Sequence, residues 1–268
     1  MPKERIAAVL ESNKIPQFGF VPFTGDLVLP SVRSVKNIPD GCKTVIVCLF
    51  PYFTGEDEER NVSRYAVSRD YHFIVKDLLV PAAEALAKEF PSYTFRAFCD
   101  ASPIAEVRAA VRAGLGVLGK NRLFLSKRYG SYVFIGEILT DLPVDCEAKE
   151  ETVCLSCGKC LSACPTGALT DTGVDITRCL SDITQRKGEF TKEEASLFDS
   201  GEFLWGCDIC QQVCPYNADA EKTPLAAFYE NRRPLVTKEN VLEDFDERAY
   251  AWRGKSVILR NIERKAKE

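Results

Sequence analysis

The sequence predicts a mixed fold, α/β or α+β, in which an N-terminal domain precedes a smaller cysteine-rich module and a short tail. The run Thr44–Phe50 is apolar and largely β-branched, as expected for a strand that is buried on both faces. Apolar residues recur at helical spacing between residues 63 and 90. Eight of the twelve cysteines lie between Cys154 and Cys214. We expect three segments: residues 1–145, 146–225 and 226–268.

Composition narrows the functional class. A chain of 268 residues with 46% hydrophobic residues can bury a sizeable core. The net charge of −4 and the pI of about 5.4 leave no overall basic field for nucleic acid, although a local patch can suffice. The N-terminus has no apolar core of the signal-peptide kind, and no window approaches the ~20 apolar residues of a membrane span. Twelve cysteines in such a chain indicate a reducing cytoplasm and metal ligation.

The N-terminal elements follow from hydrophobic patterning. Residues 2–12 predict an amphipathic helix, residues 13–40 predict loops with short strands, and residues 63–90 predict a helix that Pro81 kinks or splits. The alternation in residues 93–100 predicts a strand that delivers Asp100 to its end, where ligands of open α/β sheets bind. We expect a helix from Pro103 to about residue 113 and a strand at residues 130–140. His72, the single histidine, is expected to be a structural imidazole.

Three glycines, Gly114, Gly116 and Gly119, spell the dinucleotide-binding fingerprint G-x-G-x-x-G. That fingerprint must follow a strand and open a helix, whereas this stretch follows a predicted helix and continues into an apolar run. The sequence therefore argues against a dinucleotide site. The glycines are expected either to admit a large flat ligand or to build turns.

The cysteines form two runs. The first, Cys154 to Cys164 with a proline after it, matches the ferredoxin pattern C-x2-C-x2-C-x3-C-P, and the second, Cys207 to Cys214, repeats it with its first cysteine displaced to Cys179. Zinc favours two separated cysteine pairs, and disulfide frameworks belong to short secreted chains. We therefore predict two 4Fe–4S clusters with exchanged ligands. The first set is Cys154, Cys157, Cys160 and Cys214; the second is Cys164, Cys179, Cys207 and Cys210.

Two clusters joined in this way conduct single electrons, which implies a redox centre in the N-terminal domain. The chain resembles the epoxyqueuosine reductases, which are cobalamin-dependent iron–sulfur enzymes of the last step of queuosine synthesis in tRNA. Residues 1–50 match only loosely. The resemblance rests on blocks that keep their order: Ser63–Ala66, Arg69–His72, Cys99–Pro103, Arg112–Gly116, Gly119–Asn121, Tyr129–Tyr132, Glu137–Thr140, both cysteine runs with Arg178–Ser181 between them, Tyr216–Asn217 and Trp252–Lys255.

The resemblance implies that the N-terminal domain binds cobalamin, that the ferredoxin-like module reduces the cobalt, and that low-valent cobalt drives removal of the epoxide oxygen. It places the general acid at Asp100, whose carboxyl would need a pKa raised by burial beside the corrin. The alternative role for Asp100 is a helix cap. Further cofactor contacts are expected at Arg33, Ser63, Lys120, Asn121 and Ser181, of which the last three can also be ordinary turn or helix-start residues.

The expected partners are tRNA that carries epoxyqueuosine and an external low-potential electron donor, with no membrane and a monomeric, cytoplasmic enzyme. Many relatives continue after the Trp252–Lys255 block into helical repeats that hold tRNA, and this sequence ends thirteen residues later. The last sixteen residues, six basic against two acidic, form either a solvated helix face or a phosphate contact. The alternatives are a cobalamin reductase of a small molecule, dehalogenase-like or corrinoid-directed, and a ferredoxin-type electron carrier.

Overall fold

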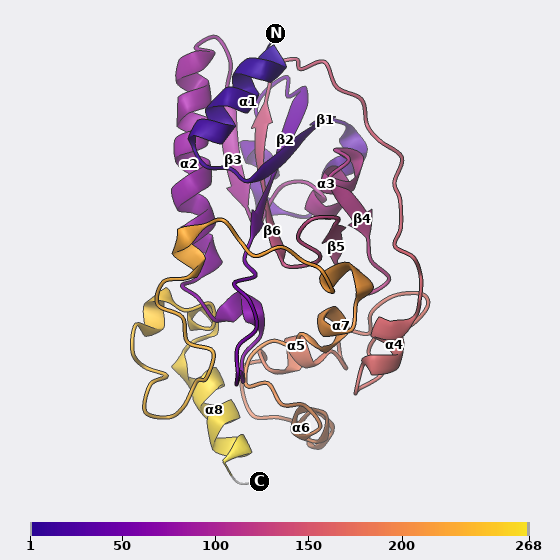
Figure 1. Ribbon diagram of the computed structural model, residues 1–268, viewed down its shortest axis with the longest axis vertical. Coiled ribbons are helices and arrows are strands. Elements are labelled where there is room, and N and C mark those ends of the chain that lie inside the picture. The colour runs from indigo at the N-terminus through magenta and orange to yellow at the C-terminus, as the bar shows by residue number, and fades with distance from the viewer. Residues whose placement is uncertain (1, 267–268) are drawn as a thin grey trace.

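The computed structural model describes residues 2–266 as an antiparallel sheet with helices on both faces, joined to a helix-and-loop module that carries most of the cysteines (Figure 1). The sheet has the strand order β1-β2-β6-β3, and every neighbouring pair is antiparallel. The mixed fold is therefore of the α+β kind in this domain. The strands are β1 (Gln17–Pro22), β2 (Thr44–Pro51), β3 (Phe95–Cys99) and β6 (Val133–Thr140).

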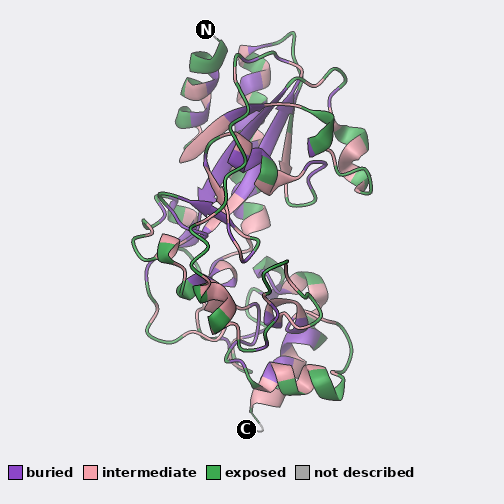
Figure 2. Ribbon diagram, turned by 90° about the vertical axis from the view of Figure 1, so that its right-hand side faces the viewer, coloured by how far each residue is buried: buried purple, intermediate pink, exposed green. Residues whose placement is uncertain are grey.

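Strand β2 is buried along its whole length, as its composition predicts (Figure 2). Successive side chains point to opposite faces of the sheet. Ile46, Cys48 and Phe50 pack beneath α1 (Pro2–Ser12) and α2 (Tyr71–Glu89), whereas Val45 and Val47 pack beneath α3 (Glu106–Arg112) on the other face. An antiparallel strand thus acquires the two-sided burial more usual in parallel sheets.

Two predicted helices begin later than expected because tertiary contacts hold their first residues. The segment 63–70 is tied down before α2 begins at Tyr71, since the Arg64 N–H donates to Asp208 and Asp70 caps the helix. The segment from Pro103 is extended as far as Ala105, whose N–H donates to the Leu27 carbonyl at 2.8 Å. The prediction that Pro81 splits α2 is wrong, because the helix runs unbroken past it.

The glycine-rich stretch forms a small hairpin of β4 (Gly116–Leu118) and β5 (Phe124–Ser126) after the left-handed Gly114. A Cβ on Gly116 would lie 2.2 Å from the Leu125 carbonyl oxygen. This close approach is to the partner strand of the chain itself, so the turn-building explanation of the glycines holds at this position.

The cysteine-rich module is built from short helices that loops connect. Its helices are α4 (Lys159–Ala163), α5 (Leu180–Ile183), α6 (Lys192–Asp199), α7 (Ile209–Gln212) and the C-terminal α8 (Lys255–Lys265). Short 3-10 turns occur in both parts of the molecule, at Gly25–Leu27, Arg33–Asn37, Arg64–Ala66, Pro215–Asn217, Ala226–Phe228, Phe245–Glu247 and Ala251–Arg253.

A third apolar core joins segments that are far apart in the sequence. Val62, Ala66 and Val67 pack against Trp205, and residues from 236 to 262 complete the cluster. Residues 226–228 return to the sheet domain, where Phe228 is buried beneath α2. The segment after residue 221 therefore contacts both parts of the molecule. None of the helices in residues 2–266 is long and apolar enough to cross a bilayer.

Candidate functional site

The first set of cysteines surrounds one small cavity at the surface of the module. Cys154 and Cys157 come from the loop before α4, Cys160 lies in α4, and Cys214 follows α7, which packs on α4. The Lys120 N–H donates to the Cys154 sulfur at 3.3 Å, the kind of hydrogen bond that tunes an iron–sulfur centre. Cys157 is exposed. The four predicted ligands are thus brought together.

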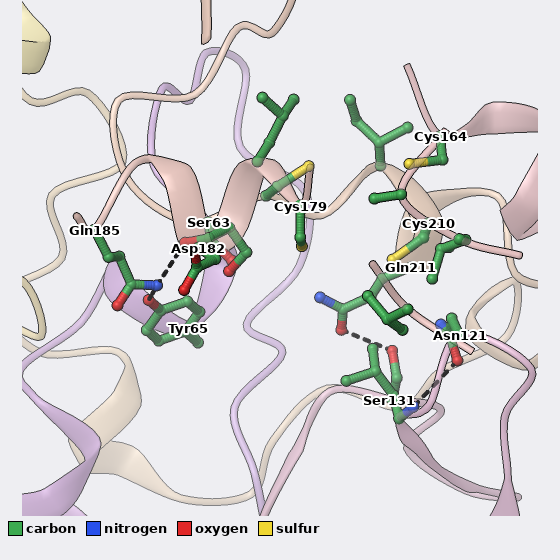
Figure 3. Close-up of a pocket in the computed structure, with 18 of the residues that line it drawn as sticks. Ser63, Tyr65, Asn121, Ser131, Cys164, Cys179, Asp182, Gln185, Cys210 and Gln211 are labelled. Carbon is green, nitrogen blue, oxygen red and sulfur yellow. Dashed lines mark hydrogen bonds between the residues drawn. The ribbon is translucent and has the colours of Figure 1, made fainter. Parts of the chain in front are cut away.

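The second set lines a much larger cavity of about 580 Å³ between the module and the sheet domain (Figure 3). Cys164 ends α4, Cys179 begins α5, and Cys207 and Cys210 flank the start of α7. Burial raises the pKa of both Cys207 and Cys210 to about 12. Burial acts in the same direction on Cys164, but hydrogen bonds from Thr166 and nearby backbone groups leave its pKa lowered.

The arrangement of the cysteines suits a cluster better than a single ion. Within residues 2–266, no group of three or more His, Cys, Asp or Glu side chains converges closely enough to bind one metal ion. Each set instead encloses a cavity, and a multi-iron cluster holds its thiolates farther apart than a zinc ion does.

A buried carboxylate ties the second cysteine set to the sheet domain. Asp208 lies between Cys207 and Cys210 and is fully buried. It accepts hydrogen bonds from the Ser63 hydroxyl, from the Arg64 N–H at 2.7 Å and from Arg60 Nη1 at 2.6 Å. Nothing in the sequence pattern singled out Asp208, although a charge inside a cysteine run has to be paired when it is buried.

Several predicted cofactor contacts line the large cavity. Ser63 and Ser181 lie in its wall, and Asn121 lies between the two cysteine cavities. The Asn121 Oδ1 accepts from the Leu123 N–H at 3.3 Å in a tight turn, while its amide nitrogen has no regular hydrogen bond and faces the Cys210 sulfur. Both the turn role and a cavity role are therefore present at this residue.

Two other predicted contacts lie elsewhere. Lys120 lines the first cysteine cavity, and its Nζ pairs with Asp171 at 2.5 Å. Arg33 lies exposed in the 3-10 turn Arg33–Asn37 and does not line the large cavity. A contact from Arg33 to a cofactor stays a prediction.

The cavity fits a large, mainly apolar ring with a polar rim. Its wall combines apolar side chains such as Phe134, Leu169 and Val174 with a smaller number of polar groups. Gln185 Nε2 donates to the Tyr65 hydroxyl at 3.3 Å, as Figure 3 shows, and the Arg253 Nε is buried without a partner in the described chain. Such a cavity, with few polar groups on an apolar surface, is typical of a cofactor site.

Asp100 lies at the mouth of an adjoining cavity of about 450 Å³ that shares Tyr65, Phe134, Ser181, Gln185 and Trp252 with the large one. It follows β3 directly, as predicted, and both Asp100 and Ala101 have positive φ angles, 56° and 28°. Its Oδ2 contacts the His72 Nε2 at 2.9 Å and accepts from the Tyr71 hydroxyl at 3.2 Å. The strained backbone marks a candidate functional position.

His72 bridges two carboxylates, which the sequence did not indicate. Its Nδ1 contacts Asp70 at 2.8 Å while its Nε2 contacts Asp100. The hydrogen bonds to Asp100 and then to Asp70 raise the pKa of His72 to about 9. His72 is satisfied, as expected of a structural imidazole, but its position beside Asp100 places it in the candidate site. The available signal was the placement of Asp70 and His72 two residues apart at the start of a predicted helix.

The expectation that burial raises the pKa of Asp100 does not hold in this conformation. The side chain is 56% exposed, and its hydrogen bond to His72 holds the pKa below its ordinary value. At neutral pH the pair is an imidazolium and a carboxylate that share one proton between Nε2 and Oδ2.

The remaining cysteines stay protonated thiols at neutral pH. Burial raises the pKa of Cys99 to about 12 and that of Cys42 to about 11, and it raises the pKa of Cys48 and Cys146 as well. None of these four cysteines lines either of the cavities around the two predicted ligand sets.

Comparison with known proteins agrees with this geometry. Residues 153–217 match the family model of the 4Fe–4S double cluster binding domain, and residues 33–101 match the model described as epoxyqueuosine reductase QueG, DUF1730. An epoxyqueuosine reductase of Leadbetterella byssophila is 34% identical over 216 residues, which are 79% of this chain and 69% of the relative. This chain belongs to the epoxyqueuosine reductase family. Its cysteine-rich module is a domain of the 4Fe–4S double-cluster type.

The similarity extends to solved structures of the family. A crystal structure of epoxyqueuosine reductase with an epoxyqueuosine-modified tRNA-Tyr stem loop has a TM-score of 0.80 at 26% identity and covers 97% of this chain and 79% of that one. The chain spans only about half, 52%, of the Aliivibrio fischeri epoxyqueuosine reductase, to which it is 38% identical. The catabolic reductive dehalogenase NpRdhA shares the fold alone, with a TM-score of 0.55 at 16% identity over 97% of this chain and 37% of that one.

Proposed function

We propose that this chain reduces epoxyqueuosine in tRNA to queuosine, with electrons that pass through two 4Fe–4S clusters to a cobalamin in the large cavity. One observation carries the proposal: the second cysteine set and the Asp100–His72 pair open onto adjoining cavities that share five wall residues. This arrangement would bring the source of electrons and the source of protons to adjoining cavities. The family and a relative crystallised with its modified tRNA stem loop support the substrate.

The residues present would hold the cofactor by its edge. Ser181, Gln185 and Asn121 would contact polar rim groups, and the unpartnered Arg253 Nε would gain an acceptor. Bound cobalamin would supply a strongly reducing, nucleophilic cobalt. A structure of a reductive dehalogenase that suggests B12-dependent chemistry is similar to this chain in fold, which agrees with the assignment.

The role of Asp100 is to hold a proton at Oδ2 for the oxygen that leaves the substrate. His72 keeps that proton within 2.9 Å at neutral pH, and Asp70 fixes the ring through Nδ1. A carboxylate that shares a proton with an imidazolium can deliver that proton at neutral pH, although an isolated aspartate would be ionised there. The positive φ of Asp100 and Ala101 gives this loop a strained geometry from which the carboxyl can turn toward the cavity.

The partners expected for this reaction are an external low-potential electron donor and tRNA, with the protein acting as a cytoplasmic monomer. The basic C-terminal end has fewer cations available for tRNA phosphates than its net charge suggests. Arg264 pairs with Asp199, Lys265 donates to the Asp199 carbonyl at 3.1 Å, and Arg260 donates to the Arg186 carbonyl at 2.9 Å. Lys267 and Glu268 lie outside the described residues.

Because these basic side chains already have partners within the chain, a second candidate function is favoured: a cobalamin-containing reductase whose substrate is a small molecule. Phosphate contacts supply much of the affinity of tRNA-binding proteins, and three of the cations near the C-terminus are already bound within the chain. A ferredoxin-type electron carrier is less well supported, because it leaves the Asp100–His72 pair and the large cavity without a role.

The test is turnover of epoxyqueuosine-containing tRNA by the Asp100→Asn variant after anaerobic reconstitution with iron, sulfide and cobalamin. We expect a loss of about 10²–10⁴-fold, because general acid catalysis contributes that much. Asp40→Asn, at an exposed loop carboxylate, is the matched control and should keep full activity. Conversion by wild type that survives in Asp100→Asn would refute the acid assignment, and bound corrin without conversion would favour the small-molecule alternative.

A further inference from the structure

A carboxyl group lies buried beneath the Asp100 loop without a hydrogen bond. Glu137 is on β6, opposite Val47 and Phe98, and both of its oxygens are buried without a partner in the described chain. It shares its sheet face with Ile135 and Leu139, so its surroundings are apolar. An ionised carboxylate is too costly in such a place, so Glu137 is held as the neutral acid.

A second glutamate connects this position to the candidate site. Glu106 is the first residue of α3, which packs against β6, and it lines a cavity of about 170 Å³ together with Tyr71 and Asp100. Burial, and then the charge of Asp100, raise the pKa of Glu106 to about 7. Near neutral pH this carboxyl therefore exchanges a proton readily.

The groups around the two glutamates are mostly neutral or negative. Asp100 lies in the loop after β3 and lines the cavity with Glu106, Phe98 of β3 lies opposite Glu137, and the buried Ser102 hydroxyl faces Glu137. Arg122 lines the same cavity, but its Nη2 donates to the Thr172 carbonyl at 2.6 Å. The residues described thus provide no ion pair to either glutamate.

The proposed reaction needs more protons than the Asp100–His72 pair holds. Reduction of an epoxide to an alkene breaks two C–O bonds, forms one C=C bond and releases water, which consumes two electrons and two protons. The electrons come from the external donor through the clusters. The pair shares a single proton at neutral pH, and a second must arrive in each turnover.

We propose that Glu106, backed by the buried acid Glu137, supplies the second proton to Asp100 through the cavity that Glu106 and Asp100 share. This inference rests on the proposed function. The proton leaves the Glu106 carboxyl for the Asp100 carboxylate, the neutral Glu137 acid stabilises the Glu106 carboxylate that remains, and solvent in the cavity returns the proton. Glu106 is the donor, and Glu137 is a positioning residue.

The test combines a pH–rate profile with a direct titration of the carboxyls. Glu106→Gln should slow turnover tenfold or more near pH 7 and remove the inflection near pH 7, without a change in affinity for the tRNA stem loop. Glu137→Gln removes the acid O–H that stabilises the Glu106 carboxylate, so it should shift that inflection to higher pH and keep most activity. Glu84→Gln, at an exposed carboxylate on α2, is the control and should behave as wild type. An unchanged pH profile in Glu106→Gln would overturn the proposal.

Infrared difference titration of the holoprotein gives a readout that does not depend on turnover. We expect a protonated-carboxyl band that disappears near pH 7 in wild type, is missing in Glu106→Gln, and disappears at lower pH in Asp100→Asn because the neighbouring charge is gone. If wild type converts no epoxyqueuosine, the proposed function fails, while this shift still supports the Glu106–Asp100 proton path. A band that does not respond to Asp100→Asn overturns the path even when turnover is normal.

Discussion

The two cysteine sets come from related ferredoxin-like runs but lie in opposite surroundings. In the first set Cys157 is exposed, and its neighbour Leu155 has 75% of its surface in solvent. In the second set Cys207 and Cys210 are buried enough for the pKa of both thiols to rise to about 12, and they face the large cavity. A shared motif thus gives one site that can meet an electron donor and another that can meet a cofactor.

The largest effect should come from removal of one ligand in each set. Cys179→Ser should lose half of the protein's iron and all measurable turnover, because the buried site adjoins the cavity. Cys157→Ser should also lose iron but keep some turnover with a small chemical reductant, which can reach the second site directly. Iron analysis and turnover with dithionite and with a protein donor check this. Equal loss in both variants with dithionite would show that the sites do not differ in this way.

An intermediate effect is expected at the anchor beneath the second set. Asp208→Asn leaves the buried Arg60 guanidinium without its countercharge, and breaking such a pair costs about 3–5 kcal/mol of stability. Urea unfolding of the anaerobic holoprotein measures this. Glu56→Gln removes the exposed partner of Arg64 and should cost at most about 1 kcal/mol. Similar costs in the two variants would contradict the special role of the buried anchor.

The smallest effect concerns the pH dependence of stability that comes from the His72–Asp100 pair in the adjoining cavity. The folded pKa of His72, about 9, lies above its ordinary 6.5, so its ion pairs stabilise the fold fully below pH 6.5, and this contribution is lost as the pH rises through 9. His72 is the single histidine, so one NMR resonance reports its titration. We expect a midpoint near 9 that falls in Asp100→Asn. A midpoint near 6.5 in wild type would show that the pair is not formed in solution.

Local sequence patterns predicted much of the fold and the grouping of the cysteines. They could not predict contacts between residues that lie far apart in the sequence. The continuous apolar run identified β2, and the ferredoxin spacing grouped the two cysteine sets around separate cavities. The delayed start of α2 depends on Asp208, which lies far away in the sequence. The lowered pKa of Asp100 depends on His72, whose bridging role arises only when α2 is placed beside β3. No periodicity encodes such pairings.

The core that joins residues 62–67 to residues 204–262 can form only after the later segment has been synthesised. At about 5–20 residues per second, the ribosome makes the later segment seven to forty seconds after the earlier one. Until then the Ser63 hydroxyl lacks Asp208, and the first cysteine run lacks Cys214. In the proposed ligand sets, the first cluster can be completed only after Cys214 has emerged and the second only after Cys210, so the earlier thiols stay open to oxidation during that interval.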